Sequence, residues 1–156
     1  MEVFFSDIPD EGLHLEGEFP ESIFNLDPTD SIRPAGPVRY SADLYLFDEI
    51  VAITGTLQGP FQLQCGTCLE YFDFDAEFTD WSSEVDRDPQ AGSFDLAEVV
   101  REDFLLSLPS HPRCDDYLPD RICPKADFVD EYLDGSAAPV EEDEGRNVWG
   151  ALDQWK

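Results

Sequence analysis

The sequence has little positive charge. Among its 156 residues, 9 Lys and Arg stand against 36 Asp and Glu, which gives a formal net charge of -27. Nucleic-acid binding draws most of its affinity from cations placed at phosphates, so this chain repels a polyanion at long range. Arg33 and Arg39 are too few to supply a phosphate-binding patch. The composition therefore disfavours direct RNA binding.

The excess of acidic residues fits a basic partner, whose approach it would accelerate at low salt. Such acidity is also typical of proteomes adapted to high salt, where it covers every solvated surface. Both explanations remain open from the composition.

Long apolar runs are also absent. No run of about twenty apolar residues is available to span a bilayer. The first residues lack the basic and apolar regions of a signal peptide. We therefore expect no membrane segment and a cytoplasmic location. In a reducing compartment, cysteines occur more often as thiols or metal ligands than as disulfides.

Motifs for catalysis are missing as well. The two histidines, His14 and His111, have no catalytic motif beside them, and there is neither an HExxH motif nor a glycine-rich phosphate loop. Carboxylate pairs occur throughout so acidic a chain by chance, so they do not identify an acid/base pair. The acidic run at residues 141–144 lacks the spacing of a calcium-binding loop. We expect a protein that is not an enzyme.

The four cysteines are the residues whose type and spacing point to chemistry. Cys65-Gly-Thr-Cys68 has the spacing by which two thiolates bind one Zn²⁺. Cys114 and Cys123 are the candidates to complete a tetrahedral shell, and His111 could replace one of them. Eight residues, 115–122, separate this second pair, against the two to four that are usual within a zinc knuckle.

Three states of the Cys65 and Cys68 pair remain open from the sequence. They are a structural zinc site, reduced thiols without metal, and a redox-active pair. A redox-active pair has the least support. In thioredoxin-like proteins the pair lies at the start of a helix that follows a strand, whereas here the residues on both sides of the pair show the apolar–polar alternation of strands.

Alternation of apolar and polar residues predicts an antiparallel sheet. Strands are expected at 13–19, 38–46, 50–57, 61–65 and 72–78, with a turn at 48–49 and a break at Gly59-Pro60. Cys65 and Cys68 then lie at the tip of a second hairpin. Residues 20–37 are expected to form a long connection with one helical turn near 21–25, and residues 82–92 a charged loop.

One helix is predicted after the strands. Asp95, followed three residues later by Glu98, resembles a capping box. An apolar stripe then runs to Pro109, and it is suited to cover one face of the sheet; its members are Leu96, Val99, Val100, Phe104 and Leu108.

These elements predict an α+β fold: an antiparallel β-sheet or partial barrel of about five or six strands, with one packed helix and a C-terminal helix. Residues 1–135 are expected to form a single α+β domain and residues 136–146 an acidic linker. Residues 147–156 are expected to form an amphipathic helix, docked on the core or reserved for a partner; its apolar residues are Val148, Trp149, Leu152 and Trp155.

Three segments resemble a known family in their order and spacing. The first is Leu63-Gln-Cys-Gly-Thr-Cys-Leu69, a strand followed by CxxC and Leu. The second runs from Asp95 to Pro109 and is similar to a helix of the form Asp-Leu-x-x-x-Val-x-Glu-x-x-Leu-Leu-x-Leu-Pro. The third, Asn147-Val-Trp-Gly-Ala-Leu152, is similar to a closing Asn-Pro-Phe-x-x-Leu or Asp-Pro-Arg-Trp-x-x-Leu segment. Over residues 38–156 the chain resembles the YceD-like proteins, a bacterial and plastid family linked to accumulation of large-subunit ribosomal RNA.

The resemblance implies a role in ribosomal RNA maturation or large-subunit assembly. Many family members carry a Cys-x-Gly-Leu-Cys-Pro-x-Cys-Gly run after the helix, whereas this chain has only Cys114 and Cys123-Pro124 there. Together with the charge, the resemblance leads us to expect a non-catalytic factor in large ribosomal subunit biogenesis. Its acidic surface would bind a basic large-subunit ribosomal protein or a pre-ribosomal particle. The alternatives are a metal-dependent RNA-processing enzyme and a small zinc-stabilised RNA-binding module.

Overall fold

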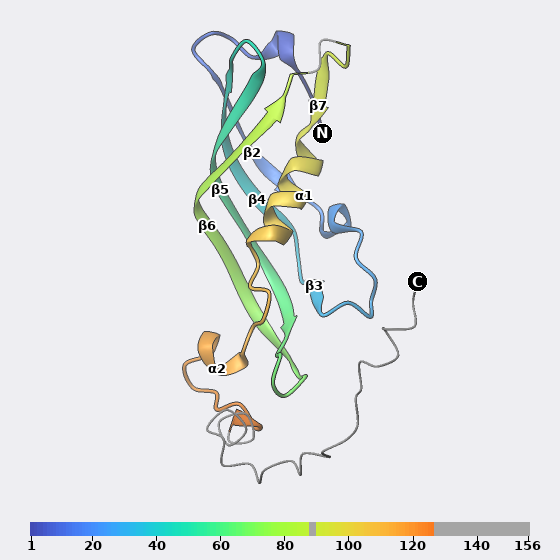
Figure 1. Ribbon diagram of the computed structural model, residues 1–156, viewed down its shortest axis with the longest axis vertical. Coiled ribbons are helices and arrows are strands. Elements are labelled where there is room, and N and C mark those ends of the chain that lie inside the picture. The colour runs from blue at the N-terminus through green and yellow to red at the C-terminus, as the bar shows by residue number, and fades with distance from the viewer. Residues whose placement is uncertain (88–89, 127–156) are drawn as a thin grey trace, which may run out of the picture. The chain divides into compact units, whose positions relative to one another are not determined.

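The computed structural model describes residues 1–87 and 90–126 (Figure 1). The chain divides into two units, Met1–Cys123 and Pro124–Lys156. Every strand and helix below belongs to the first unit. The domain boundary predicted at residue 135, the linker at 136–146 and the helix at 147–156 lie outside the described residues. Within the described residues, no helix is long and apolar enough to cross a membrane.

A five-stranded antiparallel sheet forms the body of the first unit. Strand β5 is central: β4 and then β3 pair along one of its sides, β6 pairs along the other, and β2 pairs with β4. The strands are β2 (Leu13–Phe19), β3 (Ile32–Pro34), β4 (Val38–Leu46), β5 (Ile50–Gln64) and β6 (Tyr71–Asp86).

A second, two-stranded sheet joins β1 (Glu2–Phe4) to β7 (Ser93–Asp95). The helices are α1 (Leu96–Ser107) and the short α2 (Cys114–Tyr117), with 3₁₀ turns η1 (Phe5–Asp7) and η2 (Glu21–Phe24). The sheet curls around α1 (Figure 1). The predicted α+β class, with an antiparallel sheet that forms a partial barrel and carries one packed helix, is confirmed.

Strands β2 and β4 have the bounds that alternation predicts. In β4, Val38, Tyr40, Ala42 and Leu44 are buried, while the residues between them are more exposed. A Cβ atom at Gly55 of β5 would lie 1.9 Å from the carbonyl oxygen of Ser41 on β4. Close pairing of these two strands therefore requires glycine at this position.

The predicted break at Gly59-Pro60 is wrong, because β5 runs through both residues. Pairing with β4 ends at Gln58, and pairing with β3 begins at Phe61. The Pro60 carbonyl accepts a hydrogen bond from the N–H of Ala35, 2.9 Å away. The nitrogen of Pro60 points to the same side as its carbonyl, at the gap between the end of β4 and the start of β3. No partner carbonyl requires an N–H from residue 60 there, so proline is tolerated.

The loop predicted for residues 82–92 is also wrong in its first part, since β6 continues to Asp86. A bulge explains the error. Leu57 pairs with Phe78 and Gly55 with Trp81, so two residues of β6 lie opposite one residue of β5. The extra residue shifts the inward side chains from even to odd positions, which buries Trp81 and interrupts the alternation that a regular strand would show.

Helix α1 provides the other half of the core. The carboxylate of Asp95 accepts a hydrogen bond from the N–H of Ala97 (2.9 Å), which confirms the predicted N-cap. Phe104 is fully buried, and its ring lies 5.0 Å from the rings of Phe61 and Phe78, centroid to centroid. The predicted packing of the helix against the sheet is thus confirmed.

Candidate metal centre

The first cysteine pair lies in the turn of the β5–β6 hairpin, where alternation placed it. The N–H of Cys65 donates to the carbonyl of Glu70 (2.9 Å), which closes the hairpin, and the N–H of Leu69 donates back to the carbonyl of Cys65 (3.0 Å). The N–H of Thr67 points at the Sγ atom of Cys65, 3.4 Å away. This tight turn brings both sulfurs to one side of the hairpin tip.

The second pair comes from the segment that follows α1. The N–H of Gly66 donates to the carbonyl of Pro112 (2.8 Å) and joins this segment to the hairpin tip. Cys114 opens α2, and the N–H of Leu118 donates back to its carbonyl (3.1 Å). After the short helix, the N–H of Arg121 donates to the carbonyl of Leu118 (3.0 Å), and this second turn leads the chain back to Cys123 beside the other cysteines.

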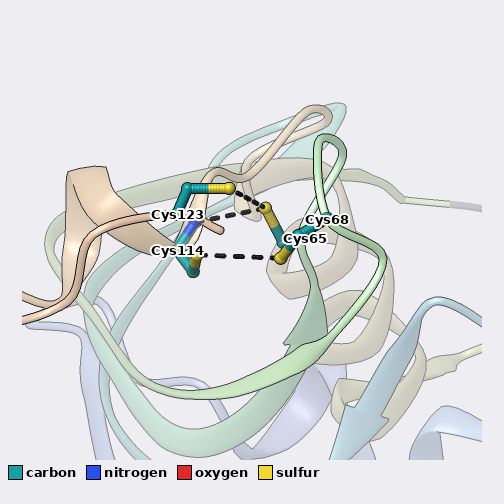
Figure 2. A group of neighbouring side chains, drawn as sticks. All are labelled: Cys65, Cys68, Cys114 and Cys123. Carbon is teal, nitrogen blue, oxygen red and sulfur yellow. Dashed lines mark hydrogen bonds between the residues drawn. The ribbon is translucent and has the colours of Figure 1, made fainter. Parts of the chain in front are cut away.

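The structure brings all four cysteines together (Figure 2). Their Sγ atoms lie within 4.8 Å of one another. The Cys65–Cys123 and Cys68–Cys114 sulfurs are both 3.9 Å apart. A tetrahedral metal with bonds of about 2.3 Å to sulfur requires sulfur separations of about 3.8 Å, whereas a disulfide bond is about 2.0 Å long. The cluster has the dimensions of a four-thiolate metal site and could hold one metal ion.

Burial and hydrogen bonding shift the pKa values of Cys65 and Cys114 in opposite directions. Burial alone raises the pKa of Cys65, but N–H donors from Cys68, Cys114 and Thr67 lower it to about 6. Burial, and after it the neighbouring cysteines, raise the pKa of Cys114 to about 12. Without a metal, Cys65 is therefore the thiol that ionises more readily at neutral pH, whereas burial, with a smaller effect of the Cys65 charge, keeps Cys114 protonated. A cation reverses the second effect by favouring thiolates.

The other candidate residues lie elsewhere. His111 is not part of the four-cysteine group, so the suggestion that it replaces a cysteine gains no support. His14 contacts Asp43 on the sheet, with 2.8 Å between Nδ1 and Oδ1. Arg33 stacks on the Tyr71 ring, whereas Arg39 pairs with the carboxylate of Glu18. The two arginines thus have separate partners within the sheet.

Sequence patterns gave no indication of the backbone groups that shape the site. The N–H groups of Thr67 and Cys114 point at Cys65 Sγ, and the Pro112 carbonyl fixes Gly66. Leu69 has a φ of 64°, a left-handed conformation that a leucine rarely adopts, and its side chain is 61% exposed. The only sequence signal for this turn is that Leu69 directly follows the CxxC motif.

Comparisons with protein-family models, curated proteins and solved structures found no match to this chain.

Proposed function

We propose that the four cysteines bind one structural zinc ion, which fixes the β5–β6 hairpin tip to the segment after α1. The observation that supports it is the pair of 3.9 Å sulfur separations within one buried cluster. Zinc prefers thiolate ligands in tetrahedral geometry, and four of them leave no coordination position for water. The site therefore stabilises the fold and does not activate a nucleophile.

The surroundings suit this ion. Four thiolates around one Zn²⁺ carry net negative charge, and the N–H groups of Thr67 and Cys114 aimed at Cys65 Sγ offset part of it. Cys65 and Cys114 are fully buried and Cys123 is 2% exposed. This burial limits exchange of the metal with solvent.

The test is the zinc content of protein purified without chelator, measured by mass spectrometry. We expect one zinc per chain, and we expect Cys68→Ser to lose it. Thr67→Ala is the matched control, because it removes a side chain from the same turn but keeps the N–H that faces Cys65. Absence of zinc from the wild-type protein would contradict the proposal. X-ray absorption showing three sulfurs and one oxygen would favour a hydrolytic zinc enzyme instead.

We further propose that this zinc-stabilised fold is a non-catalytic factor in large ribosomal subunit biogenesis, acting on a basic large-subunit ribosomal protein. Within the described residues, no charged side chain is buried, so the carboxylates are at least partly exposed to solvent. With 36 acidic residues against 9 basic ones, the chain is electrostatically complementary to proteins that bind ribosomal RNA. We propose the large subunit in particular because the chain resembles YceD-like proteins, which are linked to accumulation of large-subunit ribosomal RNA.

Binding to purified large-subunit ribosomal proteins at two ionic strengths tests the second proposal. Exposed charges are screened within about 10 Å at 0.1 M salt and about 3 Å at 1 M salt. We expect a complex at the lower concentration that weakens at least tenfold at the higher one. An affinity independent of salt would contradict the electrostatic basis, and binding to none of these proteins would contradict the function.

A further inference from the structure

Strand β6 is an edge of the sheet along its whole length. Its residues, Tyr71–Asp86, pair only with β5 among the residues that the structure describes (Figure 1). Every second residue of such a strand directs its N–H and C=O away from the sheet. Apart from the pairing with β5, no backbone hydrogen bond is made by β6 to the rest of the described chain. The edge therefore presents a row of free donors and acceptors, which is a template for another strand.

The side chains along this edge select the chemistry of an added strand. Asp73, Asp75 and Glu77 are exposed at alternate positions before the bulge. Asp73 accepts a hydrogen bond from the neutral amide of Gln62 (2.9 Å), and within the described residues none of the three carboxylates forms an ion pair. Their negative charge repels a second copy of this acidic chain and attracts a basic segment.

The opposite edge, β2, differs from β6 in its length and in its free negative charge. It is 7 residues long, against 16 for β6. On the β2 side of the sheet, Glu18 pairs with Arg39 and Asp43 contacts His14, each at 2.8 Å. The guanidinium of Arg39 therefore already neutralises one carboxylate on this side. A basic strand thus gains more backbone pairing and more charge complementarity on β6.

A hollow beside this edge supplies a place for a side chain. It lies between β6 and α1 and has a volume of about 420 Å³. Apolar surface comes from Phe78 and from Leu106, which is 77% exposed, while Asp80 and Asp103 contribute carboxylates. Asp103 also accepts a hydrogen bond from the Trp81 indole N–H (2.8 Å), which fixes its position. An apolar stem ending in a positive charge fits these walls, as in Lys or Arg.

We propose that an extended basic segment of the partner pairs with β6 along residues 72–78 and places a Lys or Arg side chain in the hollow between β6 and α1. This mode of recognition takes affinity from backbone hydrogen bonds and specificity from alternate side chains. It rests on the proposed function for the partner's basic character. It adds the surface and the conformation of the bound segment.

A labelled octapeptide of alternating Lys and Val is the probe. Its matched control has the same sequence with every backbone nitrogen methylated, which keeps the charge but removes the donors for a sheet. We expect the unmodified peptide to bind the full chain at least tenfold more tightly, and to slow hydrogen exchange of β6 amides in residues 72–78. Equal binding of the two peptides would show that charge alone acts, and would overturn the proposal.

Charge variants on the two edges separate the sites. On β6, we combine three substitutions: Asp73→Asn, Asp75→Asn and Glu77→Gln. We expect the unmodified peptide to bind this variant roughly tenfold more weakly, because three exposed charge pairs are lost. Glu16→Gln with Glu18→Gln on β2 is the control and is expected to change the affinity less than twofold. Slowed exchange in β2 instead of β6 would contradict the proposal.

The experiments distinguish failure of this inference from failure of the proposed function. A large-subunit protein that binds without slowing exchange in β6 would overturn this inference and leave the function intact. Peptide addition to β6, without binding of any large-subunit protein, would support the inference and overturn the function.

Discussion

The Sγ atoms of Cys65 and Cys123 lie 3.9 Å apart, although 58 positions separate the two residues in the sequence. One comes from the tip of the β5–β6 hairpin and the other from the turn after α2. Their proximity makes the C-terminal part of the first unit depend on the hairpin.

Removal of the proposed zinc should lower the stability of the first unit. Structural zinc contributes on the order of 10 kcal/mol to the folding of small zinc-finger peptides, whereas this unit also has a core of its own. We therefore expect chelation to lower Tm by more than about 10 °C, as a loss of several kcal/mol implies. Calorimetry with and without chelator measures this. Cys123→Ser should lower Tm similarly and should no longer respond to chelator, whereas an unchanged Tm would contradict a structural role.

In the metal-free protein, the combined contribution of Cys65 and Cys114 to stability should be largest near pH 9. Cys65 has a folded pKa lowered to about 6 from an ordinary value of 9.0. Between these values the unfolded state binds more protons at this site, so stability rises with pH and is lost as pH falls through 6. Cys114 has a folded pKa raised to about 12. Between 9 and 12 the folded state holds the extra proton, so stability falls as pH rises.

Denaturant titrations of chelated protein across pH 5–11 measure this profile. Cys65→Ser should flatten the rise below pH 9, and Cys114→Ser should flatten the fall above it. A profile unaffected by either change would mean that these thiols do not titrate differently in the two states.

Gly55→Ala should unfold or severely destabilise the sheet. The added Cβ would lie 1.9 Å from the carbonyl oxygen of Ser41, in the ladder between β4 and β5. We expect a loss of at least about 3 kcal/mol in unfolding free energy, as for a strained or overpacked core. Gly66→Ala is the control, because its Cβ would come no closer than 3.8 Å to another atom. Equal stability of the two variants would contradict this account of strand pairing.

Phe104→Ala should remove the main contact between α1 and the sheet. Its fully buried ring packs against Phe24, Phe61 and Phe78. The cavity left behind should cost about 3–5 kcal/mol in denaturant unfolding. Leu106→Ala on the same helix should cost less than about 0.5 kcal/mol, since that side chain is 77% exposed. A loss below about 1 kcal/mol for Phe104→Ala would show that α1 is not essential to the core.

Much of the sheet follows from local pattern, and its errors have long-range causes. Strand β4 buries one face and β2 half-buries one, so period-two alternation predicts their bounds. The passage of β5 through Pro60 depends on where β4 and β3 end, which no local window contains. Likewise, β1 and β7 are three residues each and pair across about ninety positions, as between Val3 and Phe94.

All four cysteines of the candidate site were named from the sequence, and the structure brings them together; the path by which they meet was not predictable. Two thiols in a hairpin turn follow from Cys65-Gly-Thr-Cys68 and the flanking alternation. The spacing of Cys114 and Cys123 is uninformative, because its meaning depends on α2 bringing the ends together. The bond from Gly66 to Pro112 depends on the path of the chain after α1. Tertiary geometry decided whether four cysteines meet.

The position of Cys123 at the end of the first unit has a consequence for synthesis of the protein. Residues 65–68 leave the ribosome early, with the hairpin that carries them, but the fourth sulfur follows β6, β7, α1 and α2. The proposed zinc would therefore have an incomplete set of ligands in the nascent chain until Cys123 has left the ribosome. Completion of the metal shell would mark the moment at which the whole first unit is available to fold.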